Sequence, residues 1–298
     1  MGSEGLSAAP RLRLLLKDPS SEVGSAAAEA LGWIGDEEAI PQLLEATHSQ
    51  HWLLVYQSAW SLGHLHAQEA RYRLTQLKDT HWSYPVRKIA GQALDSLDKP
   101  TDSTATKQRP LLPSFQILQR LISEAPRCTD NITWRGEQLQ LQTLTVWPPV
   151  SATGAWPTFI PSDARSVFPV EGGWLVGLNH GEFGGGLFHY TSSGKKRAIL
   201  KNACVGGIYQ TSSGLLATDG VDHMIYRPGN VFLLSRTSRG IWQAQPLVTL
   251  QAAPRNTAMT KDGTLVIQSQ GAIVALTQGG TLEGVECRSA ETHDPAGP

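Results

Sequence analysis

The chain has 298 residues, of which 40% are hydrophobic and 17% are charged, and its formal net charge is −1. This length allows two domains of ordinary size, and the hydrophobic content excludes a disordered chain. The near-neutral charge excludes a general attraction to nucleic acid or to an acidic membrane surface. Cys128, Cys204 and Cys287 are too far apart to form a structural zinc motif, so we expect neither a metal nor a cofactor.

The first residues, MGSEGLSAAPRLR, contain no basic segment followed by an apolar core, which a signal peptide requires. The apolar runs elsewhere are too short to span a membrane. The composition also looks similar to that of bacterial cytosolic proteins. We therefore expect a cytoplasmic protein without a membrane partner.

A repeat occupies the first third of the chain. Three copies of Val-x-x-x-Ala recur at intervals of 32 and 31 residues, and spacings of three and four place the small residues around them on one helical face. A second, shorter helix is expected after each of the first two copies, at 39–46 and 69–77. Two helices per unit, at a period near 30, predict an α-solenoid over residues 1–97. The copies are Val23/Ala27, Val55/Ala59 and Val86/Ala90.

The stretch DPSSEVGSAAAEALGWIGDEEAIPQLLEA, which begins with a helix-start signal at residues 18–21, resembles the short HEAT repeat. This repeat is also found in phycobilisome lyases. The resemblance covers roughly residues 8–97, although the third unit lacks a clear second helix. It implies a protein-binding surface and does not imply lyase activity.

Tryptophan and histidine recur within these repeats, with His-Trp at 51–52 and again at 81–82. One role for such tryptophans is packing between the repeats. A second role is a face that binds a partner, because tryptophan often anchors protein interfaces. We predict that Trp52, Trp60 and Trp82 contribute to such a face.

The composition changes after the repeats. Residues 98–113 are rich in proline, serine and threonine, and residues 114–124 have the spacing of one amphipathic helix, so 98–127 is predicted to be a linker with a bracing helix. From residue 138 to 146 the sequence QLQLQTLTV alternates strictly, which predicts a strand with one buried face.

The second half contains Thr-x-x-Gly five times, each between short apolar runs, where a hairpin turn needs glycine. These turns divide residues 166–286 into three units of four antiparallel strands, A to D. Such units predict a β-propeller and resemble blades of the broad NHL/PQQ-like sort. Residues 128–163 are expected to add a fourth blade or a closing strand, and a β-sandwich is the alternative fold.

The predicted fold class is therefore α+β multidomain: an N-terminal HEAT-like α-solenoid followed by an all-β small or partial β-propeller. The propeller-like domain is expected at 128–290, with a disordered tail at 291–298.

The stretch NHGEFGGG, residues 179–186, falls in the B–C turn of the first blade and is four residues longer than the matching turn of the last blade. The middle blade is also long there, at 219–230. Both turns emerge on one face, and we predict that this face binds a partner. The exposed residues are expected to be Asn179, His180, Glu182, Phe183, Asp222, His223, Tyr226 and Arg227.

Two alternative roles for these turns stay open. His180 and Glu182 could act as acid and base of a hydrolase or lyase, and with Asp222 and His223 they could hold a divalent metal. In the second alternative, the glycines only supply unusual dihedral angles for the turn. The sequence contains no GxSxG, HExxH or phosphate-binding glycine loop before a helix, which disfavours catalysis.

The prediction for function is a non-catalytic protein–protein interaction module with one protein partner. A small pairing of this kind looks similar to bacterial immunity proteins that bind and neutralise a cognate toxin. An enzyme using His180 and Glu182 is one alternative. A second alternative, suggested by the lyase-type repeat, is a scaffold or assembly factor of a multiprotein complex.

Overall fold

A computed structural model describes residues 3–99, 115–125, 128–143, 156–221 and 228–285. The chain divides into two compact units, residues 1–122 and 123–298. No helix in the described ranges is long and apolar enough to cross a membrane. The expected tail at 291–298 lies outside them.

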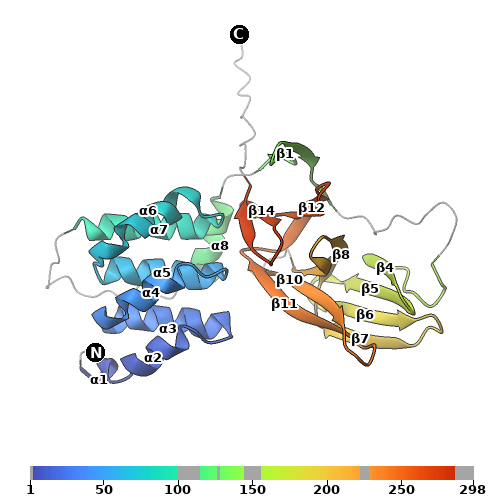
Figure 1. The fold of residues 1–298 in the computed structure, drawn as a ribbon, viewed down its shortest axis with the longest axis horizontal. Helices are drawn as coiled ribbons and strands as arrows, with labels where there is room; N and C mark the ends of the chain where they lie inside the picture. Colours follow the sequence, from blue (N-terminus) through green and yellow to red (C-terminus); the bar gives the residue numbers. More distant parts are fainter. Residues whose placement is uncertain (1–2, 100–114, 126–127, 144–155, 222–227, 286–298) are drawn as a thin grey trace, which may run out of the picture. The chain divides into compact units, whose positions relative to one another are not determined.

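The first unit is helical (Figure 1). Two single 3-10 turns, Glu37–Ala39 and Gln68–Ala70, lead into α4 and α6, so both short helices start within two residues of the predicted positions. The third repeat has α7 but no second helix within the residues described up to 99, as expected. The helices are α1 (Ser3–Leu6), α2 (Ala9–Leu15), α3 (Ser21–Ile34), α4 (Ile40–Ala46), α5 (Trp52–His64), α6 (Arg71–Thr80), α7 (Tyr84–Leu97) and α8 (Phe115–Ser123).

The helix α3 shows why these residues form a repeat. The Ser20 hydroxyl accepts a hydrogen bond from the Val23 amide at 3.4 Å and caps the first turn, and Gly35 ends the helix with φ of 74°. Ala27, Ala28 and Leu31 lie on its inner face and are buried. The predicted helix start is thus confirmed, and so is the buried face from Ala27 to Leu31, whereas Val23 of the repeat pattern is 38% exposed.

The long helices α3, α5 and α7 stack side by side. A Cβ atom at Gly63 of α5 would lie 2.6 Å from the Ala93 Cα of α7, which only a glycine avoids. At the other side of α5, the Ser61 hydroxyl donates to the Ala28 carbonyl of α3 at 2.8 Å. Small residues therefore permit the close approach that the sequence predicted.

The helix α8 falls in the first compact unit rather than between the two. Its side chains Leu118 and Ile122 are buried. The residues before it, 100–114, lie outside the described ranges, so the predicted linker is only described at its two ends.

The second unit contains two four-stranded antiparallel sheets and one five-stranded sheet, and each includes four consecutive strands in sequence order (Figure 1). We call them blades 1 to 3, and they confirm the register predicted from the turns. Blade 1 is β4 (Ser166–Val170), β5 (Gly173–Asn179), β6 (Gly185–Thr191) and β7 (Lys196–Lys201). Blade 2 is β8 (Val205–Thr211), β9 (Gly214–Asp219), β10 (Gly229–Arg236) and β11 (Trp242–Leu250). Blade 3 is β12 (Pro254–Met259), β13 (Leu265–Ser269), β14 (Ala272–Leu276) and β15 (Leu282–Gly284).

Four of the five Thr-x-x-Gly turns share one backbone hydrogen bond, which the glycine amide donates to the threonine carbonyl. At 191–194 the Gly194 amide donates to the Thr191 carbonyl at 2.8 Å, and the Thr191 hydroxyl accepts from the Lys195 amide at 3.0 Å. Gly194 has φ of 83°, which explains the glycine. The turn at 211–214 differs, because Thr211 pairs directly with Gly214 in a tighter hairpin.

The segment before blade 1 departs from prediction. The expected strand at 138–146 is broken: β2 (Glu137–Gln140) pairs with β1 (Asn131–Trp134), whereas β3 (Gln142–Thr143) pairs with β12 of blade 3. The Leu141 amide donates to the Asp130 carbonyl at 2.7 Å, which ends the hairpin. Within the described residues, the predicted closing strand is represented by the short β3.

Blades 1 and 2 share one core, in which Leu175 and Leu187 of blade 1 contact Val205 and Ile208 of blade 2. The outer face of blade 3 is covered by the β1–β2 hairpin, whose Ile132 packs with residues of β13 and β14.

The outer face of blade 1 is covered by residues 156–164, including Ile160 and Ala164. No strand of blade 1 pairs with a strand of blade 3 in the described ranges. The unit is a partial β-propeller whose two outer faces are covered by segments outside the blades.

Candidate functional site

The turn between β5 and β6 holds the NHGEFGGG stretch. A single 3-10 turn at Gly181–Phe183 is closed by hydrogen bonds from the His180 amide to the Gly184 carbonyl, 2.8 Å, and from the Phe183 amide to the His180 carbonyl, 3.2 Å. Gly181 and Gly184 have φ of 61° and 91°, so the glycines serve the turn. The Phe183 side chain is 92% exposed at its tip. The side chain of Glu182 lies outside the described part of the structure.

His180 has a carboxylate partner that the sequence did not suggest. Its Nε2 lies 2.9 Å from Asp163 Oδ2, and Asp163 comes from the segment that covers blade 1. The side chains of His180 and Asp163 are 40% and 61% exposed. The pair fixes the imidazole on the surface, but no buried acid–base arrangement surrounds it in the residues described.

Cys204 ties the enlarged turns of blades 1 and 2 to each other. Its thiol donates to the Gly181 carbonyl at 3.0 Å, its amide donates to Asp219 Oδ1 at 2.6 Å, and its carbonyl accepts from the Gly220 amide at 3.1 Å. Cys204 is buried and is a free cysteine. The end of β9 and the B–C turn of blade 1 are thus held by one residue at the start of β8.

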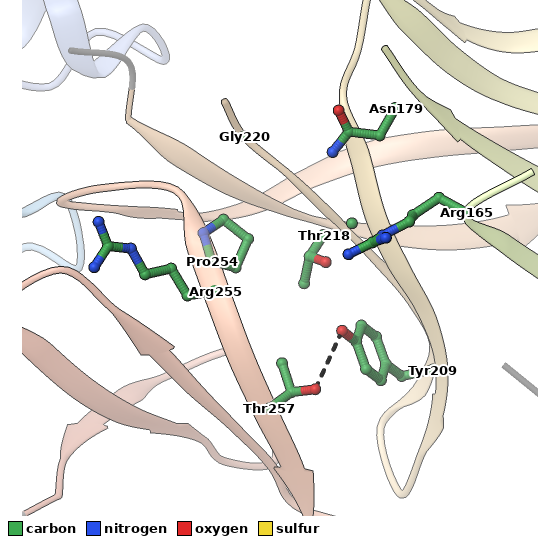
Figure 2. A pocket seen from close by; sticks show the side chains of 9 residues that line it. Arg165, Asn179, Tyr209, Thr218, Gly220, Pro254, Arg255 and Thr257 are labelled. Carbon is green, nitrogen blue, oxygen red and sulfur yellow. Dashed lines mark hydrogen bonds between the residues drawn. The ribbon is translucent and has the colours of Figure 1, made fainter. Parts of the chain in front are cut away.

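A polar pocket opens at this end of the blades, where β5 and β9 finish and the first strand of each blade begins (Figure 2). Its volume is about 70 Å³. Of the residues predicted for the binding face, Asn179 lines it, while His180 and Phe183 do not. The other lining residues are Arg165, Gly206, Tyr209, Thr218, Gly220, Pro254, Arg255 and Thr257.

Four side chains of this pocket were not predicted from the sequence: Arg165, Tyr209, Thr218 and Thr257. Arg165 directly precedes the first strand of blade 1. Tyr209, Thr218 and Thr257 lie in the first or second strand of their blades. Successive side chains of a strand point to opposite faces of its sheet, but the sequence does not show which face lies against another blade. The predicted order of the strands identified only the turns as candidate binding residues.

Asp222, His223, Tyr226 and Arg227 lie outside the described residues, so the second enlarged turn is seen only at its ends. Within the described ranges no three histidine, cysteine, aspartate or glutamate side chains are grouped as a metal site would need. The metal alternative therefore finds no support from residues 179–221 and 228–285.

The predicted tryptophans of the helical unit have different environments. Trp52 is 2% exposed and belongs to the core, so it cannot contact a partner unless the helical unit unfolds. The prediction that Trp52 contributes to the binding face is therefore wrong. Trp60 is half-buried and stacks on His64, with ring centroids 5.0 Å apart. It also contacts Trp33 at 5.1 Å. Trp33 was not predicted, although it occupies the repeat position that His64 holds one unit later.

Trp82 is half-buried and stacks on His81 at 5.5 Å. The His81 Nδ1 accepts a hydrogen bond from the Ser83 amide, 3.0 Å, at the start of α7. Burial, with the nearby charges of Arg73 and Arg87, lowers the pKa of His81 to about 3. This histidine is therefore a neutral structural residue at ordinary pH.

Comparison with known proteins agrees with the helical half. Residues 2–63 match the family model for HEAT repeats, which confirms HEAT repeats at the N-terminus. A search of curated proteins gives no match. Among solved structures, the chain is similar to one named as a candidate gluconolactonase, with 17% identity and a TM-score of 0.31. That similarity covers 43% of this chain and 51% of the other, and at this level it says nothing of activity.

Proposed function

We propose that this protein is a non-catalytic interaction protein that binds one protein partner. The observation that carries the proposal is the HEAT repeat at residues 2–63, since HEAT repeats generally mediate protein–protein binding. The finer proposal is a bacterial, cytoplasmic immunity protein that neutralises a cognate toxin by steric cover.

The β unit supports a second contact surface. Phe183 exposes nearly its whole ring at the tip of a turn whose backbone is fixed by three internal hydrogen bonds and by the Cys204 thiol. An aromatic side chain presented on a rigid support loses little conformational freedom on binding, which favours affinity. We propose Phe183 as the anchor of the propeller face and Trp60, with Trp33, as the anchor of the helical face.

The enzyme alternative has less support. A general acid–base pair usually lies in a concave site where burial adjusts the pKa values. The His180–Asp163 pair is exposed and does not line the pocket. We therefore propose binding without turnover.

The experiment is capture of partners by the full chain from a lysate of its source organism, followed by mass spectrometry and a binding titration with the purified partner. Phe183→Ala and Trp60→Ala should each weaken binding by at least tenfold, and Phe183→Ala should leave the melting temperature unchanged. Tyr72→Ala is the matched control, because Tyr72 is 75% exposed but lies on α6 outside both proposed anchors.

The proposal is contradicted if the Phe183 and Trp60 variants bind the partner as tightly as the unmodified protein, or if no stoichiometric partner is captured. The toxin form is tested separately: co-expression of the chain should restore growth to cells that produce the captured partner. A partner that is harmless to those cells rejects the toxin form and leaves the interaction protein.

A further inference from the structure

The pocket of Figure 2 has properties that partner binding through Phe183 does not use. The nine lining residues that the structure describes include two arginines, Arg165 and Arg255, and no acidic residue. The rest of the polar lining is one amide and three hydroxyls. A pocket with this lining attracts an anion.

Two described carboxylates close in sequence to the lining residues, Asp219 and Asp163, are already engaged. Asp219 accepts from the Cys204 amide at 2.6 Å and from the Asn230 amide nitrogen at 3.4 Å, and Asp163 pairs with His180. Arg165 forms no side-chain hydrogen bond or ion pair with the described part of the chain, and Figure 2 shows its guanidinium directed toward Thr218 and Tyr209. The guanidinium therefore has donors available to a ligand.

Thr218 supplies an independent observation. It is 1% exposed, and its Oγ1 atom has no partner at hydrogen-bond geometry in the residues described. The Tyr209 hydroxyl is near enough to Thr218 for the threonine to oppose the rise that burial causes in the tyrosine pKa, but the two groups are not aligned as a hydrogen bond. A buried hydroxyl without an aligned partner costs free energy unless a water, an ion or a ligand satisfies it. A ligand oxygen in the pocket would satisfy this hydroxyl.

Asn179 is oriented for the same purpose. Its Oδ1 accepts from the Gly181 amide at 3.0 Å, which leaves the side-chain NH₂ as the group it can offer to a ligand. Tyr209 has only a long contact of 3.4 Å between its hydroxyl and Thr257 Oγ1. The hydroxyls of Tyr209 and Thr257 can therefore turn toward a ligand acceptor at little cost in free energy.

The donor set defines the ligand class. A planar guanidinium beside an amide and hydroxyl donors suits a carboxylate, which accepts several hydrogen bonds in one plane. A volume of about 70 Å³ is far below the 300–1,000 Å³ typical of cofactor and drug-sized ligands, so only a small group enters. From these observations we propose that the pocket binds a carboxylate group, held by Arg165, Asn179 and Thr218.

A carboxylate group that enters the pocket can come from two sources. One is a small free carboxylate such as acetate, and the other is an aspartate or glutamate side chain of a protein partner. The second source rests on the proposed function, whereas the first does not. The experiment therefore begins with the purified full chain alone.

Sodium acetate, blocked aspartate (N-acetyl-aspartate N-methylamide) and inorganic phosphate are titrated by calorimetry and ligand-observed NMR, against chloride at equal ionic strength. Acetate or blocked aspartate should bind saturably, and phosphate should bind at least tenfold more weakly. Arg165→Gln should lower carboxylate affinity at least tenfold, and Thr218→Val should lower it severalfold while the free protein stays folded. Arg197→Gln, which changes an exposed arginine on β7, is the matched control and should have no effect.

Blocked aspartate binding at least tenfold tighter than acetate assigns the pocket to a partner's side chain, and the reverse order assigns it to a free carboxylate. Binding no stronger than chloride, tighter binding of phosphate, or unchanged affinity in Arg165→Gln overturns the proposal. Any of these results leaves partner binding through Phe183 untouched, because that is measured with different variants. Loss of partner binding in Phe183→Ala alone likewise leaves the pocket untouched.

Discussion

The helical and β units both stack repeats, but they end their stacks differently. In the helical unit the interior Trp52 is buried, while its counterpart Trp82, beside the last repeat, is only half-buried. In the β unit the two outer blades are each covered by a segment that belongs to no blade. A repeat period therefore describes the interior of a stack, whereas the ends depend on residues that do not repeat.

The largest effect is expected from Leu187→Ala, which empties a position buried between blades 1 and 2. Loss of a fully buried leucine here should cost about 3–4 kcal/mol of unfolding free energy. Leu139→Ala in the covering hairpin should cost about 2 kcal/mol, the low end for such a change, because its partner surface is smaller and lies at an end. Urea unfolding followed by circular dichroism measures both. Equal losses would show that the hairpin belongs to the same core as the blades and would end the distinction between interior and cover.

The next effect concerns the interior of the helical stack. In Gly63→Ala the new Cβ would meet the Ala93 backbone at 2.6 Å, so α5 and α7 must separate, at a cost of about 2 kcal/mol. Gly91→Ala on α7 is the matched control, because its nearest neighbour lies at 4.0 Å. Without a clash, alanine should stabilise the helix by about 0.5–1 kcal/mol. Thermal unfolding measures the two variants. The same sign for both would mean that small residues do not set the helix spacing.

The last effect depends on pH and tests the last repeat. The unfolded chain protonates His81 near pH 6.5, whereas the folded chain keeps it neutral until about pH 3. Its contribution to stability is therefore complete above pH 6.5 and is lost as pH falls, by at most about 1.4 kcal/mol per pH unit. His81→Asn keeps an acceptor for the Ser83 amide and cannot take the proton, so it should flatten the decline between pH 6 and 4.

Urea unfolding at pH 7, 6, 5 and 4 measures this slope, and His180→Asn is the control because His180 is exposed. A slope unchanged by His81→Asn, or flattened equally by His180→Asn, would show that His81 does not carry it.

Much of the fold could be predicted because its signals are local. The spacing of Val55 and Ala59 reports one helical face, and Thr191-x-x-Gly194 reports one hairpin turn. Both needed only neighbours in sequence. The break at Leu141 could not be predicted, because QLQLQTLTV alternates evenly and the pairing of β3 with β12 depends on residues as distant as Asn256.

The candidate site could be predicted less well, for the same reason. Asn179 was found because it adjoins an enlarged turn. Arg165 and Thr218 were missed because their importance comes from the approach of three blades, and Asp163 was missed as the partner of His180 because it arrives on a covering segment. Glycines and turn lengths identify a surface, while the chemistry of a pocket requires the packing.

The order of the segments along the chain has a consequence for synthesis. The hairpin at 131–140 leaves the ribosome before any blade, yet the surface that it covers lies on β13 and β14, more than a hundred residues later. Its Arg135 pairs with Glu283, near the end of the described chain. Contacts this distant in sequence form late and slowly. The apolar side of the hairpin must therefore wait uncovered while three blades are made, which makes the nascent β unit, rather than the helical one, the part most exposed to aggregation and most in need of a chaperone.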